Sequence, residues 1–167
     1  ARAGMRLVLS GRRPAELQAV ADQVAAIGRE TGNGASARVA PLDVADKDAV
    51  LAVAASIQAQ EGRIDVLVNN AGITQPVKTL DITGTDYDRI LDVSLRGTLY
   101  MSQAVLPTMK AQRTGSIVCI SSVSAQRGGG IFGGPHYSAA KAGVLGLARA
   151  MAREFGAEGI RINCITP

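Results

Sequence analysis

Residues 64–72, Ile-Asp-Val-Leu-Val-Asn-Asn-Ala-Gly, decide the fold class of this chain. Residues 64–68 form a short, apolar run, and residues 69–72 follow it as a turn of small and polar residues. A strand that is apolar throughout, rather than at alternate positions, is typical of a parallel sheet covered on both faces. We therefore expect a buried parallel strand at 64–68 whose carboxyl end opens onto the turn at 69–72.

The same pattern continues on both sides of this stretch, where short apolar runs alternate with amphipathic segments. Helical spacing is clear over residues 14–30, where Leu17, Val20 and Val24 fall on one face and Pro14 suits the first helical position. The expected strands cover residues 5–10, 35–41, 64–68, 116–121 and 161–165. The expected helices cover residues 14–30, 45–61, 84–93, 97–111 and 136–156. This alternation predicts an α/β fold with a doubly wound parallel sheet, organised as a single domain over residues 1–167.

Composition narrows the function classes to which the chain can belong. Hydrophobic residues make up 47% of its 167 residues and charged residues 19%, which excludes a disordered chain. Aromatic residues are only 3% and Trp is absent, which argues against a binder of single-stranded nucleic acid. The net charge of +4 includes no basic run longer than Arg12-Arg13, so a local anion site fits better than a nucleic-acid surface. No apolar run approaches the roughly 20 residues of a membrane-spanning helix.

The two cysteines, Cys119 and Cys164, lie in apolar strand-like runs and lack metal-ligand spacing. We expect free thiols in a reducing compartment, and therefore a cytoplasmic protein without a metal site.

The string Tyr137-Ser-Ala-Ala-Lys141 places a phenol and an ammonium one helical turn apart. A phenol, with a reference pKa of about 10, is a poor acid–base group at neutral pH. A neighbouring ammonium favours the phenolate, and the positive end of the helix dipole acts in the same direction. Ser122 lies at the end of an expected strand, where its hydroxyl could hold a carbonyl oxygen beside the phenol. Taken alone, this spacing is a weak signal, because a surface tyrosine beside a solvated lysine shows the same pattern.

Four segments follow one another along the chain: Asn69-Asn70-Ala71-Gly72, Ile120-Ser121-Ser122, Tyr137 to Lys141, and Asn163-Cys-Ile-Thr-Pro167. In their order and approximate spacing they resemble the short-chain dehydrogenase/reductase family, and the resemblance covers nearly the whole chain. The segment that follows Lys141 is similar to the branch that includes 3-oxoacyl-[acyl-carrier-protein] reductases and sugar or polyol dehydrogenases. The resemblance implies a Rossmann-like fold and the transfer of a hydride between a nicotinamide cofactor and a ketone or secondary alcohol.

The resemblance also implies a role for each matching residue. Tyr137 would give a proton to the carbonyl oxygen, Ser122 would hold that oxygen, and Lys141 would bind the nicotinamide ribose and make the phenol more acidic. Asp43 would reach the adenine amino group with Val44 beside the ring. Further cofactor contacts are implied for Asn70, Ala71, Gly72, Thr166 and Pro167, the last two beside the nicotinamide.

The turn after the first expected strand bears on the choice of cofactor. A site for NAD usually places a carboxylate there, against the ribose 2′-hydroxyl. This chain has Arg12 and Arg13, and arginine suits a 2′-phosphate. We therefore predict NADP(H) rather than NAD(H), with two solvated turn residues as the alternative.

The chain departs from the family pattern in two respects. Ser94 stands where the family usually has an asparagine that supports a kinked helix and a water chain to the lysine, so the departure puts the contribution of Ser94 to the site in question. The glycine-rich turn with its central first strand, and the last strand, are missing from the sequence. We therefore expect an incomplete sheet and a segment of a longer protein.

The leading function hypothesis is an NADP(H)-dependent reductase of a 3-oxoacyl thioester. A sugar or polyol dehydrogenase is the alternative within the enzymes, and a non-catalytic binding or regulatory protein is the alternative outside them. A Ser-His-Asp hydrolase built on His136 is disfavoured because no GxSxG elbow surrounds Ser122. Asp86 and Asp88 are interpreted as a solvated helix face. We expect a small-molecule carbonyl or alcohol as substrate, and a homodimer or homotetramer formed through the helices at 97–111 and 137–156.

Overall fold

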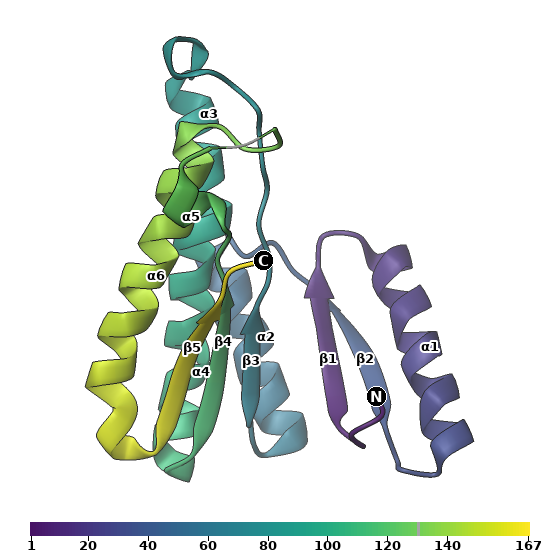
Figure 1. The fold of residues 1–167 in the computed structure, drawn as a ribbon. Coiled ribbons are helices and arrows are strands. Elements are labelled where there is room, and N and C mark those ends of the chain that lie inside the picture. Colours follow the sequence, from purple (N-terminus) through teal and green to yellow (C-terminus); the bar gives the residue numbers. More distant parts are fainter. Residues whose placement is uncertain (130) are drawn as a thin grey trace. The chain divides into compact units, whose positions relative to one another are not determined.

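The computed structural model describes residues 1–129 and 131–167. The chain forms two compact units, Ala1–Asp43 and Val44–Pro167 (Figure 1).

The first unit is a single strand–helix–strand motif. Strands β1 (Arg6–Gly11) and β2 (Ser36–Pro41) pair in parallel, and helix α1 (Pro14–Thr31) connects them. Pro14 begins the helix, where its missing N–H costs nothing, and Gly32 ends it in the left-handed region at φ 62°. The buried apolar residues of this unit are Ala21, Val24, Ala35 and Leu42.

The second unit contains a three-stranded parallel sheet in the order β3-β4-β5. The strands are β3 (Val66–Asn69), β4 (Gly115–Ile120) and β5 (Ile160–Ile165). Because all three strands run in the same direction, their carboxyl ends meet at one edge of the sheet. The residues that follow β3, β4 and β5 therefore lie together at that edge.

Helices α4 (Gly97–Gln112) and α6 (Pro135–Phe155) cover one face of this sheet (Figure 1). Together with the strands they enclose the main core, which includes Val105, Met109, Ile117, Val144 and Ile160. The unit also contains α2 (Lys47–Glu61), α3 (Gly84–Leu91), α5 (Ser124–Arg127) and the short 3-10 turns η1 (Thr79–Asp81) and η3 (Gly156–Glu158). A π-helical turn, η2 (Asp92–Arg96), joins α3 to α4.

The five expected strands and the five expected helices are all present, and their ends shift by one or two residues. Helix α2 starts at Lys47 because Asp46 caps it, accepting a hydrogen bond from the Ala49 N–H at 3.0 Å. The expected helix at 84–93 is α-helical only to Leu91. The short α5 lies in a segment where the sequence indicated a loop.

The parallel α/β architecture confirms the predicted fold class. The described strands form two sheets, β1-β2 and β3-β4-β5, as expected of a doubly wound sheet that lacks its central strand. Within the described residues, no helix is both long and apolar enough to cross a membrane. Cys119 and Cys164 are free thiols, as predicted, and burial raises the pKa of each.

Candidate active site

Helix α6 places Tyr137 and Lys141 on one face, one turn apart. The Lys141 ammonium nitrogen lies 5.9 Å from the centre of the Tyr137 ring. Tyr137 is half-buried, whereas Lys141 is only 4% exposed. The spacing in the sequence therefore brings the two side chains together, which a solvated surface pair would not require.

The Lys141 ammonium lies at the carboxyl end of the sheet. Its Nζ donates a hydrogen bond to the Ile120 carbonyl oxygen at 2.8 Å, at the last residue of β4. Burial lowers the pKa of Lys141, because the surrounding protein disfavours the charged form. The ammonium is thus held at the sheet edge by one strong contact in a poorly hydrated place.

Two adjacent serines follow β4, and their hydroxyls have different partners. Ser121 is buried, and its Oγ donates to the Lys141 carbonyl oxygen at 2.7 Å. Ser122 is half-buried, and its Oγ accepts from the Ser124 N–H at 3.2 Å. Ser121 therefore ties α6 to the end of β4, an anchoring contact that the sequence did not reveal. The Ser122 hydroxyl keeps its own proton available for another acceptor.

The turn after β3 reaches the same place. Asn70, Ala71 and Gly72 are all exposed, and a Cβ atom on Gly72 would lie 3.1 Å from Lys141 Nζ and 3.6 Å from Ser94 Oγ. The absence of a side chain at position 72 therefore leaves the backbone open beside the ammonium.

Asn69 anchors this turn. Its side chain is buried and donates to Ser102 Oγ on α4 at 3.1 Å. The sequence motif includes Asn69, but the sequence alone assigned it no role. A polar residue on the inward-facing side of the strand, two positions after Leu67, was the available signal.

Ser94 lies in the π-helical turn η2 and is 1% exposed. Its Oγ makes long contacts with the Ile73 backbone, 3.4 Å to the N–H and 3.5 Å to the carbonyl oxygen. A π-helical turn inside an α-helical segment is frequent at functional sites. The departure from the family pattern thus places a short hydroxyl beside Gly72 and near Lys141.

Several of the implied cofactor residues also belong to this unit. The Pro167 carbonyl oxygen accepts from the Val123 N–H at 2.9 Å, so the segment with Thr166 and Pro167 lies beside the residue that follows Ser122. Val44 packs on the start of α4, because a Cβ on Gly97 would lie 2.6 Å from Val44 Cγ2.

Arg12, Arg13 and Asp43 belong to the first unit. Arg12 Nη1 lies 3.8 Å from Asp43 Oδ2, and Arg13 Nη1 lies 2.8 Å from Glu16 Oε2. Both guanidinium groups are exposed, at the turn between β1 and α1. Two residues implied at the adenosine end of a cofactor, Arg12 and Asp43, are therefore near neighbours.

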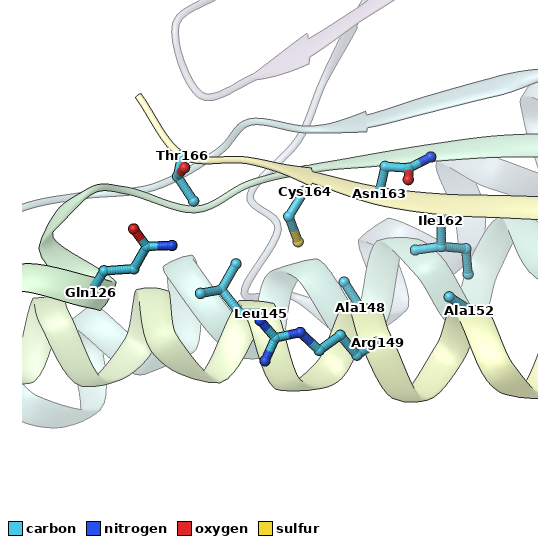
Figure 2. Close-up of a pocket in the computed structure, with 9 residues that line it drawn as sticks. All are labelled: Gln126, Leu145, Ala148, Arg149, Ala152, Ile162, Asn163, Cys164 and Thr166. Atoms are coloured by element: carbon cyan, nitrogen blue, oxygen red, sulfur yellow. The ribbon is translucent and has the colours of Figure 1, made fainter.

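A cavity of about 350 Å³ lies between α6 and β5 (Figure 2). Its lining residues are Gln126, Leu145, Ala148, Arg149, Ala152, Ile162, Asn163, Cys164 and Thr166. Of the predicted site residues it includes Thr166, but not Ser122, Tyr137 or Lys141. A second cavity of about 480 Å³ has His136 in its wall.

Comparison with known proteins identifies the family. The family model for short chain dehydrogenases matches residues 1–167. The chain belongs to the short-chain dehydrogenase/reductase family. An uncharacterized short-chain type dehydrogenase/reductase of Sinorhizobium fredii is 60% identical over 125 residues, which are 75% of this chain and 49% of that protein. A 3-oxoacyl-[acyl-carrier-protein] reductase FabG of Thermotoga maritima is 41% identical over 129 residues, 75% of this chain and 50% of that protein.

Solved structures of short-chain dehydrogenases have the same fold. A metagenomic short-chain oxidoreductase in complex with NADP superposes with a TM-score of 0.90 at 30% identity, covering 99% of this chain and 72% of that one. The chain corresponds to about half the length of the two relatives described above.

Proposed function

We propose that the protein containing this chain is an NADP(H)-dependent oxidoreductase that interconverts a ketone and a secondary alcohol. Residues 1–167 would form part of its single dinucleotide-binding and catalytic domain. The main support is the position of Lys141 in a chain of this family: its ammonium meets the end of β4 and the open backbone of Gly72, one turn from Tyr137. A 3-oxoacyl thioester is the first substrate class to test, because the Thermotoga maritima relative carries that activity in its name.

The proposed chemistry divides between the cofactor and the protein. A bound nicotinamide supplies or accepts the hydride. Tyr137 gives its phenol proton to the carbonyl oxygen during reduction and takes it back during oxidation. Ser122 donates a hydrogen bond to the same oxygen, and the Lys141 ammonium stabilises the negative charge left on the phenol oxygen. Ser94 would complete the polar surroundings of Lys141 in place of the usual asparagine.

The open turn at Asn70, Ala71 and Gly72 fits a flat cofactor that lies along the backbone. A side chain at position 72 would crowd the Lys141 ammonium, which itself would bind the ribose hydroxyls. Val44, Thr166 and Pro167 complete the proposed cofactor contacts in the second unit. In the first unit, Asp43 would bind the adenine amino group.

For the 2′-phosphate we propose Arg12 and Arg13, with Arg12 as the stronger contributor. Arg13 is held by Glu16 at 2.8 Å, whereas Arg12 is 3.8 Å from its carboxylate and gives up less on binding an anion. Loss of a charge-assisted hydrogen bond of about 1.5–3 kcal/mol corresponds to a fall of roughly 10- to 150-fold in kcat/KM for NADPH. The test compares Arg12→Ala with Arg13→Ala, using NADPH and NADH. A preference for NADH in the unmodified protein, left unchanged by Arg12→Ala, would overturn this assignment.

The reaction is tested by loss of absorbance of reduced nicotinamide with a 3-oxoacyl thioester, a sugar ketone and a simple ketone. Tyr137→Phe removes only the phenol oxygen, so turnover should fall to background while cofactor binding, followed by fluorescence, stays within about twofold of the original. Tyr87→Phe, on the exposed face of α3, is the matched control and should keep full turnover. Equal turnover in Tyr137→Phe and the unmodified protein would remove the mechanism.

We further propose a cytoplasmic homodimer or homotetramer. Four small residues of α6 lie at helical spacing along one side of the helix: Ala139, Ala142, Gly146 and Ala150. A flat surface of small side chains allows close helix packing between copies. Light scattering at micromolar concentration should give a mass of two or four chains, and a monomer would contradict the proposal.

A further inference from the structure

The chain has one histidine, His136, and it precedes Tyr137 in the first turn of α6. Its side chain is 2% exposed, and its Nε2 lies 3.2 Å from the Gln75 side-chain oxygen. The Gln75 amide nitrogen in turn donates to Asp86 Oδ1 at 2.6 Å. These contacts connect the loop after β3, helix α3 and the start of α6.

Asp86 sets the direction of this chain of hydrogen bonds. Its carboxylate also accepts from Thr83, at 2.6 Å from the hydroxyl and 3.1 Å from the backbone N–H, as the capping box of α3. Hydrogen bonds from the Thr83 hydroxyl, the Gln75 amide and the Thr83 backbone lower the pKa of Asp86 to about 2. The carboxylate is therefore ionised at neutral pH and can only accept hydrogen bonds. The interpretation of Asp86 as part of a solvated face is thus incomplete.

The protonation of His136 follows from that direction. Because the Gln75 NH₂ group must face the carboxylate, its carbonyl oxygen faces His136 and can only accept. His136 Nε2 must then carry the proton. The other ring nitrogen, Nδ1, is buried without a hydrogen-bond partner among the described residues. A second proton at Nδ1 would lie buried without an acceptor among the described residues, so the geometry favours the neutral ring.

The same junction supports the Tyr137 ring. The Gly134 N–H donates to the backbone carbonyl oxygen of Gln75 at 2.8 Å. The Thr74 hydroxyl donates to the backbone carbonyl oxygen of Phe132. A Cβ atom on Gly133 would overlap the Tyr137 ring, so the backbone of this segment lies directly on the phenol. Contacts that hold the loop after β3 against the segment before α6 therefore also hold the Tyr137 ring in place.

We propose that His136 is a positioning residue for Tyr137, locked as the neutral Nε2–H tautomer by Gln75, which Asp86 orients. The lock holds the loop after β3 and the segment before α6 in the register that supports the phenol. Its effect on turnover rests on the proposed oxidoreductase function, whereas the tautomer itself does not.

The first test observes the tautomer directly, in the protein that contains this chain. Long-range ¹H–¹⁵N spectra of ¹⁵N-histidine-labelled protein at pH 7 distinguish the two neutral tautomers from the imidazolium. The signals of His136 are those lost in His136→Gln. We expect a protonated Nε2 and a bare Nδ1. An Nδ1–H tautomer or an imidazolium would overturn the proposal.

A second variant breaks the lock while leaving the cap of α3 in place. Gln75→Met keeps the side-chain length but removes the contacts to both His136 and Asp86, and Thr83 still binds Asp86. The His136 spectrum should then move away from the pure Nε2–H pattern. An unchanged spectrum in Gln75→Met would show that the amide does not hold the tautomer, and the proposal would fail.

The second test measures the consequence for catalysis. We expect kcat to fall about tenfold in Gln75→Met and His136→Leu, with the KM for NADPH within about twofold of the original. His136→Gln restores an N–H donor near the Nε2 position and should recover most of the loss. Asp88→Asn, exposed on the same helix as Asp86, is the matched control. Normal kcat in both Gln75→Met and His136→Leu would overturn the positioning role. No turnover in the unmodified protein would instead count against the proposed function and leave the tautomer result standing.

Discussion

Replacing Lys141 with methionine should separate the stability of the fold from its chemistry. Lys141 is 4% exposed, its ammonium donates to the Ile120 carbonyl oxygen at 2.8 Å, and burial lowers its pKa. Methionine has a similar length and no charge, so the substitution removes the ammonium while keeping most of the packing.

Two opposing effects set the magnitude of the change in stability. A hydrogen bond from a charged donor contributes about 1.5–3 kcal/mol to stability. The effective cost of taking an ammonium out of water is on the order of several kcal/mol. Burial lowers the pKa of Lys141, so the desolvation cost opposes the gain from the hydrogen bond. Because methionine is close in volume, we expect the free energy of unfolding at pH 7 to change by less than about 1.5 kcal/mol.

The two proteins should differ in their pH dependence. In the folded state Lys141 releases its proton at a lower pH than in the unfolded state, where the ordinary value of 10.5 holds. At any pH below the pKa of Lys141 in the folded state, the folded protein carries the full cost of burying the ammonium. Between the folded pKa and 10.5 the unfolded state binds more protons, so the free energy of unfolding of the original protein rises with pH relative to Lys141→Met. The slope for one proton cannot exceed about 1.4 kcal/mol per pH unit.

The assay is urea unfolding of both proteins across neutral to alkaline pH. The quantity plotted against pH is the free energy of unfolding of the original protein minus that of the variant. Lys78→Met, at an exposed position, is the control and should give a flat difference. Turnover of Lys141→Met should fall by on the order of 100-fold or more, since the ammonium no longer assists the phenol. A flat or falling difference for Lys141→Met, or a loss above about 3 kcal/mol at pH 7, would refute the reasoning.

Three further substitutions probe local contacts, each measured by urea unfolding. Gly28→Ala should destabilise the first unit by about 1–3 kcal/mol, because its Cβ would overlap the Ala35 carbonyl oxygen; an unchanged midpoint would mean that α1 can move away freely. Asp46→Ala removes the N-cap of α2 and should cost about 1 kcal/mol, whereas Asp46→Asn should restore most of it. Ser121→Ala breaks the bond to the Lys141 carbonyl and should cost about 0.5–1.5 kcal/mol; no loss would show that α6 needs no anchor at β4.

The strands and helices could be predicted from the sequence because each carries its signal locally. The run at 64–68 is apolar at nearly every position, and Pro14 with Gly32 marks the two ends of α1. The π-helical turn at Asp92–Arg96 has no comparable local signal. It continues a helical sequence, and the one extra residue in the turn is not visible in side-chain periodicity.

In the candidate site, too, the features with a local sequence signal could be predicted, and those that depend on distant residues could not. Tyr137 and Lys141 could be predicted as a pair because both lie on one helix, where spacing fixes direction. The contacts that support them join residues far apart in sequence, such as Ser121 with the Lys141 carbonyl and Asn69 with Ser102. A serine or asparagine at a strand end is usually a turn residue, and only tertiary packing turns it into a buried anchor.

Arg12 and Asp43 show how a contact within the protein bears on the proposed cofactor site. Both side chains are about half exposed and 3.8 Å apart, a geometry in which an ion pair contributes little to stability. Breaking that pair to admit a phosphate therefore costs little, and a dianionic group offers a stronger, bidentate contact than one distant carboxylate oxygen. Asp43 keeps the guanidinium near the turn without competing strongly for it. Arg13 must give up a 2.8 Å contact to Glu16 for the same gain, and so Arg12 should contribute more to the discrimination between the two cofactors.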